Sequence, residues 1–143
     1  MRTALLATLL VTAQPARAQF ISVSGSPSTL VVSSAFAGSP LNPATDASTS
    51  YFLIVLGGTL QKITAQLSSP MPAGVTLAAT LAPPPGATSS GAVPLDITPQ
   101  TMVTGIGFTI ASRGISYQLS ATPAAGVVPL QSRTVTLTVT AAP

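Results

Sequence analysis

The stretch Thr134-Val135-Thr136-Leu137-Thr138-Val139-Thr140 decides the fold class of this chain. Threonine and branched apolar residues alternate along it without exception. Because successive side chains of a β-strand point to opposite faces of the sheet, this pattern predicts a strand buried on one face only. We expect its Val, Leu and Val side chains to enter a core, while its threonines face water or a partner.

Short apolar runs rich in Val, Ile, Leu and Thr recur upstream of this strand, and Gly, Pro or Ser bounds each run. This spacing is typical of an all-β sandwich, and the fourteen prolines, mostly between the runs, argue against long helices. We therefore expect an antiparallel β-sandwich of about seven to nine strands. The predicted strands are residues 20–24, 29–33, 51–56, 60–67, 75–81, 93–98, 102–110, 115–121 and 133–140.

Tyr51-Phe52-Leu53-Ile54-Val55-Leu56 departs from alternation because all six residues are apolar. A continuous apolar run of this length predicts a central strand buried on both faces. Gly57-Gly58-Thr59, which follows, is interpreted as the hairpin turn to the next strand. The four phenylalanines are expected to fill the core: Phe20, Phe36, Phe52 and Phe108.

An internal repeat runs through the middle of the chain. Ile63-Thr64-Ala65-Gln66-Leu67-Ser68 is echoed by Ile115-Ser116-Tyr117-Gln118-Leu119-Ser120, and the match continues without a gap to Ala73-Gly74-Val75 and Ala125-Gly126-Val127. The repeat predicts two equivalent hairpins, one in each half of the sandwich, with both glycines at positive φ. Convergence between two β-hairpins of similar composition is the alternative.

The N-terminus has the three parts of a secretory signal peptide in their usual order. Met1-Arg2-Thr3 is a short basic start, residues 4–13 form an apolar run, and Ala16-Arg17-Ala18 supplies small residues at alternate positions. The run is too short to span a bilayer, which takes about 20 residues, and a buried helix is the alternative. We expect cleavage after this motif, so that residues 1–18 are the signal and residues 19–143 form one domain without a membrane span, exported to the periplasm, cell surface or medium.

Charged residues make up only 5% of the chain, against about 25% in a typical soluble domain. The domain after the signal keeps three basic residues against two acidic ones, a net charge of +1. Such a chain lacks the basic footprint that binds nucleic acid or anionic lipid. It has no Cys, so no disulfide staples it.

Catalytic and metal-binding chemistry has few side chains to use here. The chain has no His, no Cys and no Glu, and its carboxylates are Asp46 and Asp96, which are interpreted as surface or turn residues. Calcium ligation by Asn42 and Asp46, or a Ser–Lys dyad with Lys62, lacks a supporting motif. We expect neither an enzyme, nor a cofactor, nor a metal site.

A neutral, Thr-rich and strand-rich surface tends to associate, because few charges keep copies apart. This favours a chain that partners cover, while a compositional bias toward Ala, Pro and Thr is the alternative. The tyrosines are expected at strand edges with wet hydroxyls, and the basic residues either act as solubilising or edge-protecting charges or orient a partner. The candidate partner contacts are Phe20, Ile21, Val23, Tyr51, Lys62, Arg113, Tyr117 and Arg133.

The alternating strand 133–140 is similar to the closing strand of bacterial immunoglobulin-like sandwiches, and the pattern extends over most of the expected domain. The chain also loosely resembles exported pilin and spore-coat-U-type subunits. That resemblance implies an incomplete sandwich that a neighbour's N-terminal strand completes, and Phe20-Ile21-Ser22-Val23-Ser24 is the candidate donor.

These features predict a non-enzymatic, secreted structural or assembly subunit that acts through protein–protein surfaces in a cell-surface or extracellular homopolymer. Two other functions stay open. One is a membrane-extrinsic accessory subunit on the periplasmic face of a membrane complex, such as a respiratory or photosynthetic assembly. The other is a glycan-binding or adhesion module that uses Asp46, Asp96 and the tyrosines.

Overall fold

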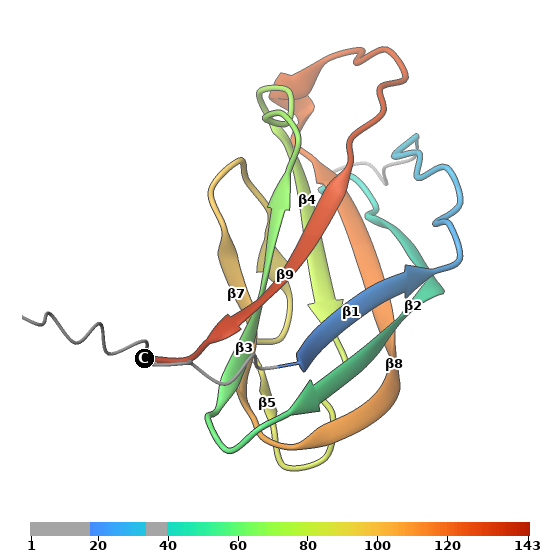
Figure 1. The fold of residues 1–143 in the computed structure, drawn as a ribbon. Helices are drawn as coiled ribbons and strands as arrows, with labels where there is room; N and C mark the ends of the chain where they lie inside the picture. The colour runs from blue at the N-terminus through green and yellow to red at the C-terminus, as the bar shows by residue number, and fades with distance from the viewer. Residues whose placement is uncertain (1–17, 34–39) are drawn as a thin grey trace, which may run out of the picture.

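The computed structural model describes residues 18–33 and 40–143, which fold into two layers of β-strands (Figure 1). This part of the chain holds one short 3₁₀ helix, η1 (Pro123–Ala125), and no α-helix. The predicted signal peptide, apart from its last residue, and Phe36 lie outside the described residues. The strands are β1 (Ala18–Ser24), β2 (Ala44–Leu56), β3 (Gln61–Leu67), β4 (Val75–Leu81), β5 (Thr88–Ser89), β6 (Val93–Pro94), β7 (Gln100–Ile106), β8 (Thr109–Ala121) and β9 (Val135–Ala141).

The strands form two sheets. The first sheet has the order β1-β2-β8-β4-β6, and the second has the order β5-β7-β3-β9. Every pair of hydrogen-bonded strands runs antiparallel. The prediction of an all-β fold with antiparallel sheets is therefore confirmed, and the two layers are consistent with a β-sandwich.

The core lies between the sheets and is built from the inward rows of side chains. Alternate residues of β2 and β3 are buried, whereas the residues between them are more exposed. The alternation predicted for the C-terminal strand is also confirmed, because its Val and Leu side chains pack against the core and its threonines are exposed. The largest fully buried side chains are Tyr51, Leu53, Ile63, Leu81, Met102, Ile106, Ile115, Gln61, Val55, Val103 and Pro84.

Three predicted hairpins are wrong, because the two strands that each one joins lie in different sheets. Gly57-Gly58-Thr59 connects β2 of the first sheet to β3 of the second. The two halves of the repeat behave likewise, since β3 and β4 lie in opposite sheets, as do β8 and β9. A local glycine turn predicts where a strand ends, but long-range pairing decides which sheet the next strand joins.

The predicted positive φ of the repeat glycines is confirmed. Gly74 has φ +77° and Gly126 has φ +61°. At Gly74 a Cβ atom would also lie 2.8 Å from the Thr122 hydroxyl, so the two connections of the repeat pack against each other. The Thr122 amide donates to the Gly74 carbonyl at 2.8 Å, which fixes this contact.

Several strand boundaries differ from the prediction: β2 begins at Ala44 and not at residue 51, and the short strand β5 was not predicted. Residues 29–33 form no strand, and 93–98 reduce to β6 because the next residues cross from the first sheet to the second. The crossing is visible in two bonds: the Leu95 amide donates to Leu77 of β4, and the Leu67 amide of β3 donates to the Asp96 carbonyl. The predicted break at residues 111–114 lies instead at residues 107–108, so β8 is a single long strand.

The expectation that phenylalanines fill the core is wrong for all three that the structure describes. Phe20 is 52% exposed, Phe52 is 37% exposed and Phe108 is 73% exposed. The run 51–56 is also buried on its inner face only. Its even-numbered residues lie on the outer face of the first sheet, which no described element covers.

Candidate functional site: the open side between β1 and β9

Each sheet ends differently on its two sides. On one side the edge strands are β5 and β6, each two residues long. Pro94 lies in β6, and Pro83-Pro84-Pro85 precedes β5. Very short strands and prolines are the usual means by which proteins keep a sheet edge from pairing with another chain. We call this the blunt side.

On the other side the edge strands are β1 and β9, each seven residues long. Neither strand contains a proline or a charged residue. They lie beside each other, one from each sheet, toward the viewer in Figure 1. Each therefore presents unpaired backbone N–H and C=O groups along its outer edge. We call these two edges and the groove between them the open side.

At the end of the open side where β1 begins and β9 ends, a hydrogen bond joins the two sheets. There the Gln19 amide nitrogen donates to Gln61 Oε1 at 2.7 Å, which links the first sheet to the second. Gln61 is only 2% exposed, and its own amide nitrogen donates to the Thr59 carbonyl at 2.9 Å. This part-buried amide pair links the two sheets at this end, and the groove lies at the other end.

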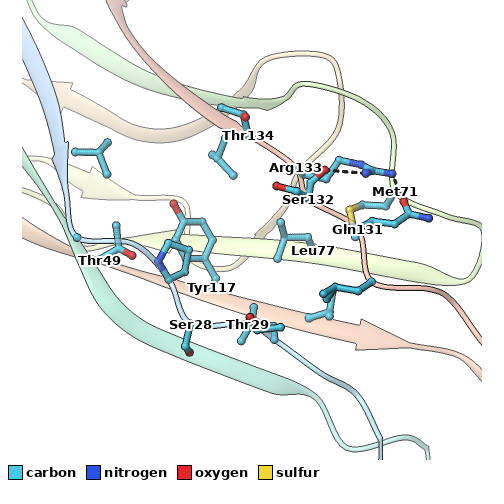
Figure 2. Close-up of a pocket in the computed structure, with 17 residues that line it drawn as sticks. Ser28, Thr29, Thr49, Met71, Leu77, Tyr117, Gln131, Ser132, Arg133 and Thr134 are labelled. Atoms are coloured by element: carbon cyan, nitrogen blue, oxygen red, sulfur yellow. Dashed lines mark hydrogen bonds between the residues drawn. The ribbon is translucent and has the colours of Figure 1, made fainter.

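At that other end, where β1 ends and β9 begins, the groove has a volume of about 690 Å³ (Figure 2). Its apolar lining includes Leu30, Met71, Leu77 and Val135, all partly buried hydrophobic residues that pack against the core. Val23, at the end of β1, is 49% exposed and lines the same groove. The edge of the core is therefore only partly covered here.

Among the polar residues that line this groove, two carry hydroxyl groups on mostly buried side chains. Thr49 is 2% exposed, and its hydroxyl has no hydrogen-bond partner within residues 18–33 and 40–143. Tyr117 lines the same groove and is 7% exposed, and burial followed by the nearby Asp46 carboxylate raises its pKa. A buried hydroxyl without a partner is costly, so Thr49 lowers the stability of the wall of this groove.

Asp46 fixes the wall of the groove through hydrogen bonds to two serines. Its Oδ2 accepts from the Ser28 hydroxyl at 2.6 Å and from the Ser28 amide at 3.2 Å. Its Oδ1 accepts from the hydroxyl and the amide of Ser48. These bonds, led by the Ser28 hydroxyl, hold the pKa of Asp46 well below its usual value. The segment after β1 is thereby tied to β2.

The arginines also use their guanidinium groups within the fold. Arg133 donates through Nε and Nη2 to the Pro70 carbonyl at 3.2 and 3.1 Å, which holds the segment before β9 against the segment after β3. Arg113 donates through Nε to the Pro83 carbonyl at 3.1 Å. Arg113 and Lys62 belong to the inner strands β8 and β3, so edge protection does not apply to these two, whereas Arg133 lies just before the edge strand β9. That the three charges keep the chain in solution or orient a partner stays a prediction.

The expectation of wet tyrosine hydroxyls at strand edges is wrong for Tyr51. Its ring is fully buried and its hydroxyl donates to the Ala82 carbonyl at 2.6 Å. Burial, partly offset by Arg113, raises the pKa of Tyr51 to about 12. Tyr117 is likewise mostly buried in the inner strand β8.

The remaining candidate contacts belong to β1, but they face two ways. Ile21 and Val23 point inward, whereas Phe20 points to the outer face beside Ile54 of β2.

The sequence did not predict the role of Thr49, because a threonine in a strand gives no sign that its hydroxyl lacks a hydrogen-bond partner. It also missed the outer face, although the continuous apolar run 51–56 was a signal that this face needs a cover.

Comparisons with known proteins find no similar protein, so a functional conclusion depends on this geometry. The chain matches no protein-family model, and searches of curated proteins and of solved structures find no significant match. Among the described residues, no helix has the length and apolarity needed to cross a membrane. The same residues hold no group of three or more His, Cys, Asp or Glu side chains that could bind a metal ion.

Proposed function

We propose that this chain is an exported, non-enzymatic assembly subunit with an immunoglobulin-like sandwich, released from a signal peptide and joined to other copies of itself at the cell surface or outside the cell. Its copies meet at the open side. The observation that carries this proposal is the contrast between two seven-residue edges without proline or charge and two blunted edges.

Backbone pairing along these edges supplies the affinity in this proposal. A strand of a neighbouring copy adds to β1 or β9 and completes the hydrogen bonding of the sheet, as in other complexes formed by strand addition. The same contact covers the inward side chains that are only partly buried on this side, such as Val23. Both contributions favour a strand-forming partner, and a second copy of the chain supplies one.

The segment 20–24, interpreted from the sequence as a strand given to a neighbour, pairs here with β2 of its own chain over its whole length. We therefore assign this segment to the sheet edge to which a neighbour's strand adds. That a neighbour donates a strand stays a prediction. In the simplest form of this contact, β9 of one copy pairs with β1 of another.

The test uses lysines as edge-blocking charges. In the variant Thr136→Lys/Thr138→Lys, two exposed threonines of β9 become lysines beside the open side. Like charges that face each other across an interface, or charges that lose their water there, cost several kcal/mol. We therefore expect the association constant to fall at least about tenfold. Sedimentation velocity of the purified protein over a concentration series measures this change.

The matched control places the same charges near the blunt side. Thr88→Lys/Thr101→Lys also changes two exposed threonines of the second sheet. We expect this variant to associate like the wild type. Equal association by all three proteins, or a monomeric wild type at high concentration, would contradict the proposed function.

A further inference from the structure

The outer face of the first sheet carries an apolar patch that the open side does not use. Cross-strand pairs build it: Phe20 lies opposite Ile54, which lies opposite Ile110. Phe52 and Leu56 flank Ile54 on the same face of β2, because residues two apart in a strand point the same way. Phe108 lies two residues before Ile110, in the turn that leads into β8, and is 73% exposed. The outer patch is Phe20, Phe52, Ile54, Leu56, Phe108 and Ile110.

We propose that the outer patch binds the outer patch of a second copy, and that this second interface turns pairs joined at the open side into a continuous polymer. The proposal rests on the proposed function. If two copies join symmetrically, each open side meets the other, and the contact closes on a pair. Growth beyond a pair then requires another surface, and two different symmetric interfaces on one subunit generate an open chain of copies.

The charge pattern favours a second copy as the occupant. No outward position of β1, β2 or β8 within the patch carries a charge, and the neighbouring outward positions are serines, Ser22 and Ser112. A charged face would repel its own copy, but an uncharged face does not. The five described charges lie elsewhere: Asp46, Lys62, Asp96, Arg113 and Arg133.

The area of the patch fits a reversible contact. A phenylalanine buries about 150–250 Å² when it leaves water, so Phe20, Phe52 and Phe108 at 52, 37 and 73% exposure offer about 250–400 Å² together. Leu56 and Ile110, 41 and 61% exposed, bring the total to about 500 Å² per copy. Two copies would bury about 1,000 Å², near the lower limit for a specific interface. Copies already paired at their open sides would reinforce such a contact through multivalency.

The experiment separates the two interfaces by sedimentation velocity and electron microscopy of the protein purified from its producing cell. The outer-patch variant is Phe108→Ser/Ile110→Thr, which changes two exposed side chains and keeps strand-compatible residues. We expect it to stop at pairs joined at the open side. The open-side variant Thr136→Lys/Thr138→Lys should stop at pairs joined through the outer patch, and the combined variant should be monomeric.

A control removes exposed apolar surface outside the patch. Val127 and Leu130 are 101% and 82% exposed in the loop before β9, so Val127→Ser/Leu130→Ser tests general stickiness and should polymerise like the wild type. Far-ultraviolet circular dichroism confirms that each variant is folded.

The outcomes distinguish the two proposals. If the outer-patch variant polymerises like the wild type, the outer patch is not an interface. If the open-side variant polymerises while the outer-patch variant stops at pairs, the open-side assignment fails and the outer patch stands. A monomeric wild type that binds phosphatidylcholine vesicles through Phe108 would overturn both.

Discussion

The blunt side and the open side finish the same two sheets in opposite ways. The loop that precedes β5 of the blunt side is held by inner strands, because Tyr51 of β2 donates to the Ala82 carbonyl and Arg113 of β8 donates to the Pro83 carbonyl. On the open side, Tyr117 lines the groove and Thr49 has a buried hydroxyl without a partner among the described residues. Satisfied polar groups and short edges are typical of a surface that pairs with no other chain. The unpaired edges and the partnerless Thr49 hydroxyl are the features on which the proposed interface at the open side depends.

The largest expected difference concerns two leucines of equal size. Leu81 of β4 is fully buried, whereas Leu137 of β9 is only partly buried. Truncation of a fully buried leucine costs about 2–5 kcal/mol, so we expect Leu81→Ala to lose about 3 kcal/mol and Leu137→Ala about 1 kcal/mol. Urea unfolding of dilute, dissociated protein measures both values. Equal losses would mean that β9 is already fully covered.

The two tyrosines give the next contrast. Tyr51→Phe removes the bond to the Ala82 carbonyl and should cost about 1 kcal/mol, whereas Tyr117→Phe should change stability by less than about 0.5 kcal/mol. The pKa of Tyr51 in the folded chain is raised to about 12. The contribution of the Tyr51 hydroxyl to the free energy of unfolding is therefore complete below the unfolded pKa of about 10. It is lost as the pH rises through about 12. The deficit of Tyr51→Phe should therefore narrow over that window, and a constant deficit would argue against burial as the cause.

Thr49 offers a substitution expected to stabilise the isolated subunit. Thr49→Val keeps the shape of the side chain but removes the orphan hydroxyl, which should add about 1 kcal/mol to the free energy of unfolding. Thr45→Val, at an exposed position of the same strand, should stay within about 0.5 kcal/mol of wild type. If an occupant of the groove bonds to Thr49, Thr49→Val should also associate more weakly. Loss of stability would show that this hydroxyl is satisfied in solution.

The smallest expected effect concerns Asp46 and the wall of the groove. Ser28→Ala removes the bond that contributes most to its low pKa, so the carboxyl pKa should rise toward about 3.9. Ser26→Ala is the control, because only the Ser26 backbone carbonyl takes part. Since the folded pKa of Asp46 is lowered, its stabilising contribution is present above about pH 4 and is lost as the pH falls through the folded value. Carboxyl-carbon NMR titration would reveal no difference between the variants if Ser28 is not a partner.

Local periodicity in the sequence was sufficient to predict β3, β4 and β9, because each strand has one inward row whose residues repeat every second position. It was insufficient at Gly57-Gly58-Thr59, because the partner of a strand is chosen by contacts far away in the sequence. The phenylalanines were misplaced for a related reason. Hydrophobicity favours burial but does not fix which face of a strand is buried, and Phe52 and Phe108 stay exposed at 37% and 73% among the described residues.

The candidate site was predicted only in part. Neutral composition indicated an associating surface, and segment 20–24 was placed at an interface. The contrast between blunt and open edges depends on which strands end each sheet, and the order β5-β7-β3-β9 cannot be deduced from local patterns. The orphan hydroxyl of Thr49 depends on the absence of a neighbour in space, which leaves no trace in the residues beside it.

Hydrogen exchange measured by mass spectrometry tests most directly whether copies join at the open side. The assembled protein is compared with the same protein diluted until it dissociates. We predict slower amide exchange on assembly in β1 and β9, because outward-pointing amides of an edge strand exchange freely until another strand pairs with them. Exchange in β5 and β6 should not change. Protection gained at β5 and β6, with β1 and β9 unaltered, would contradict the account.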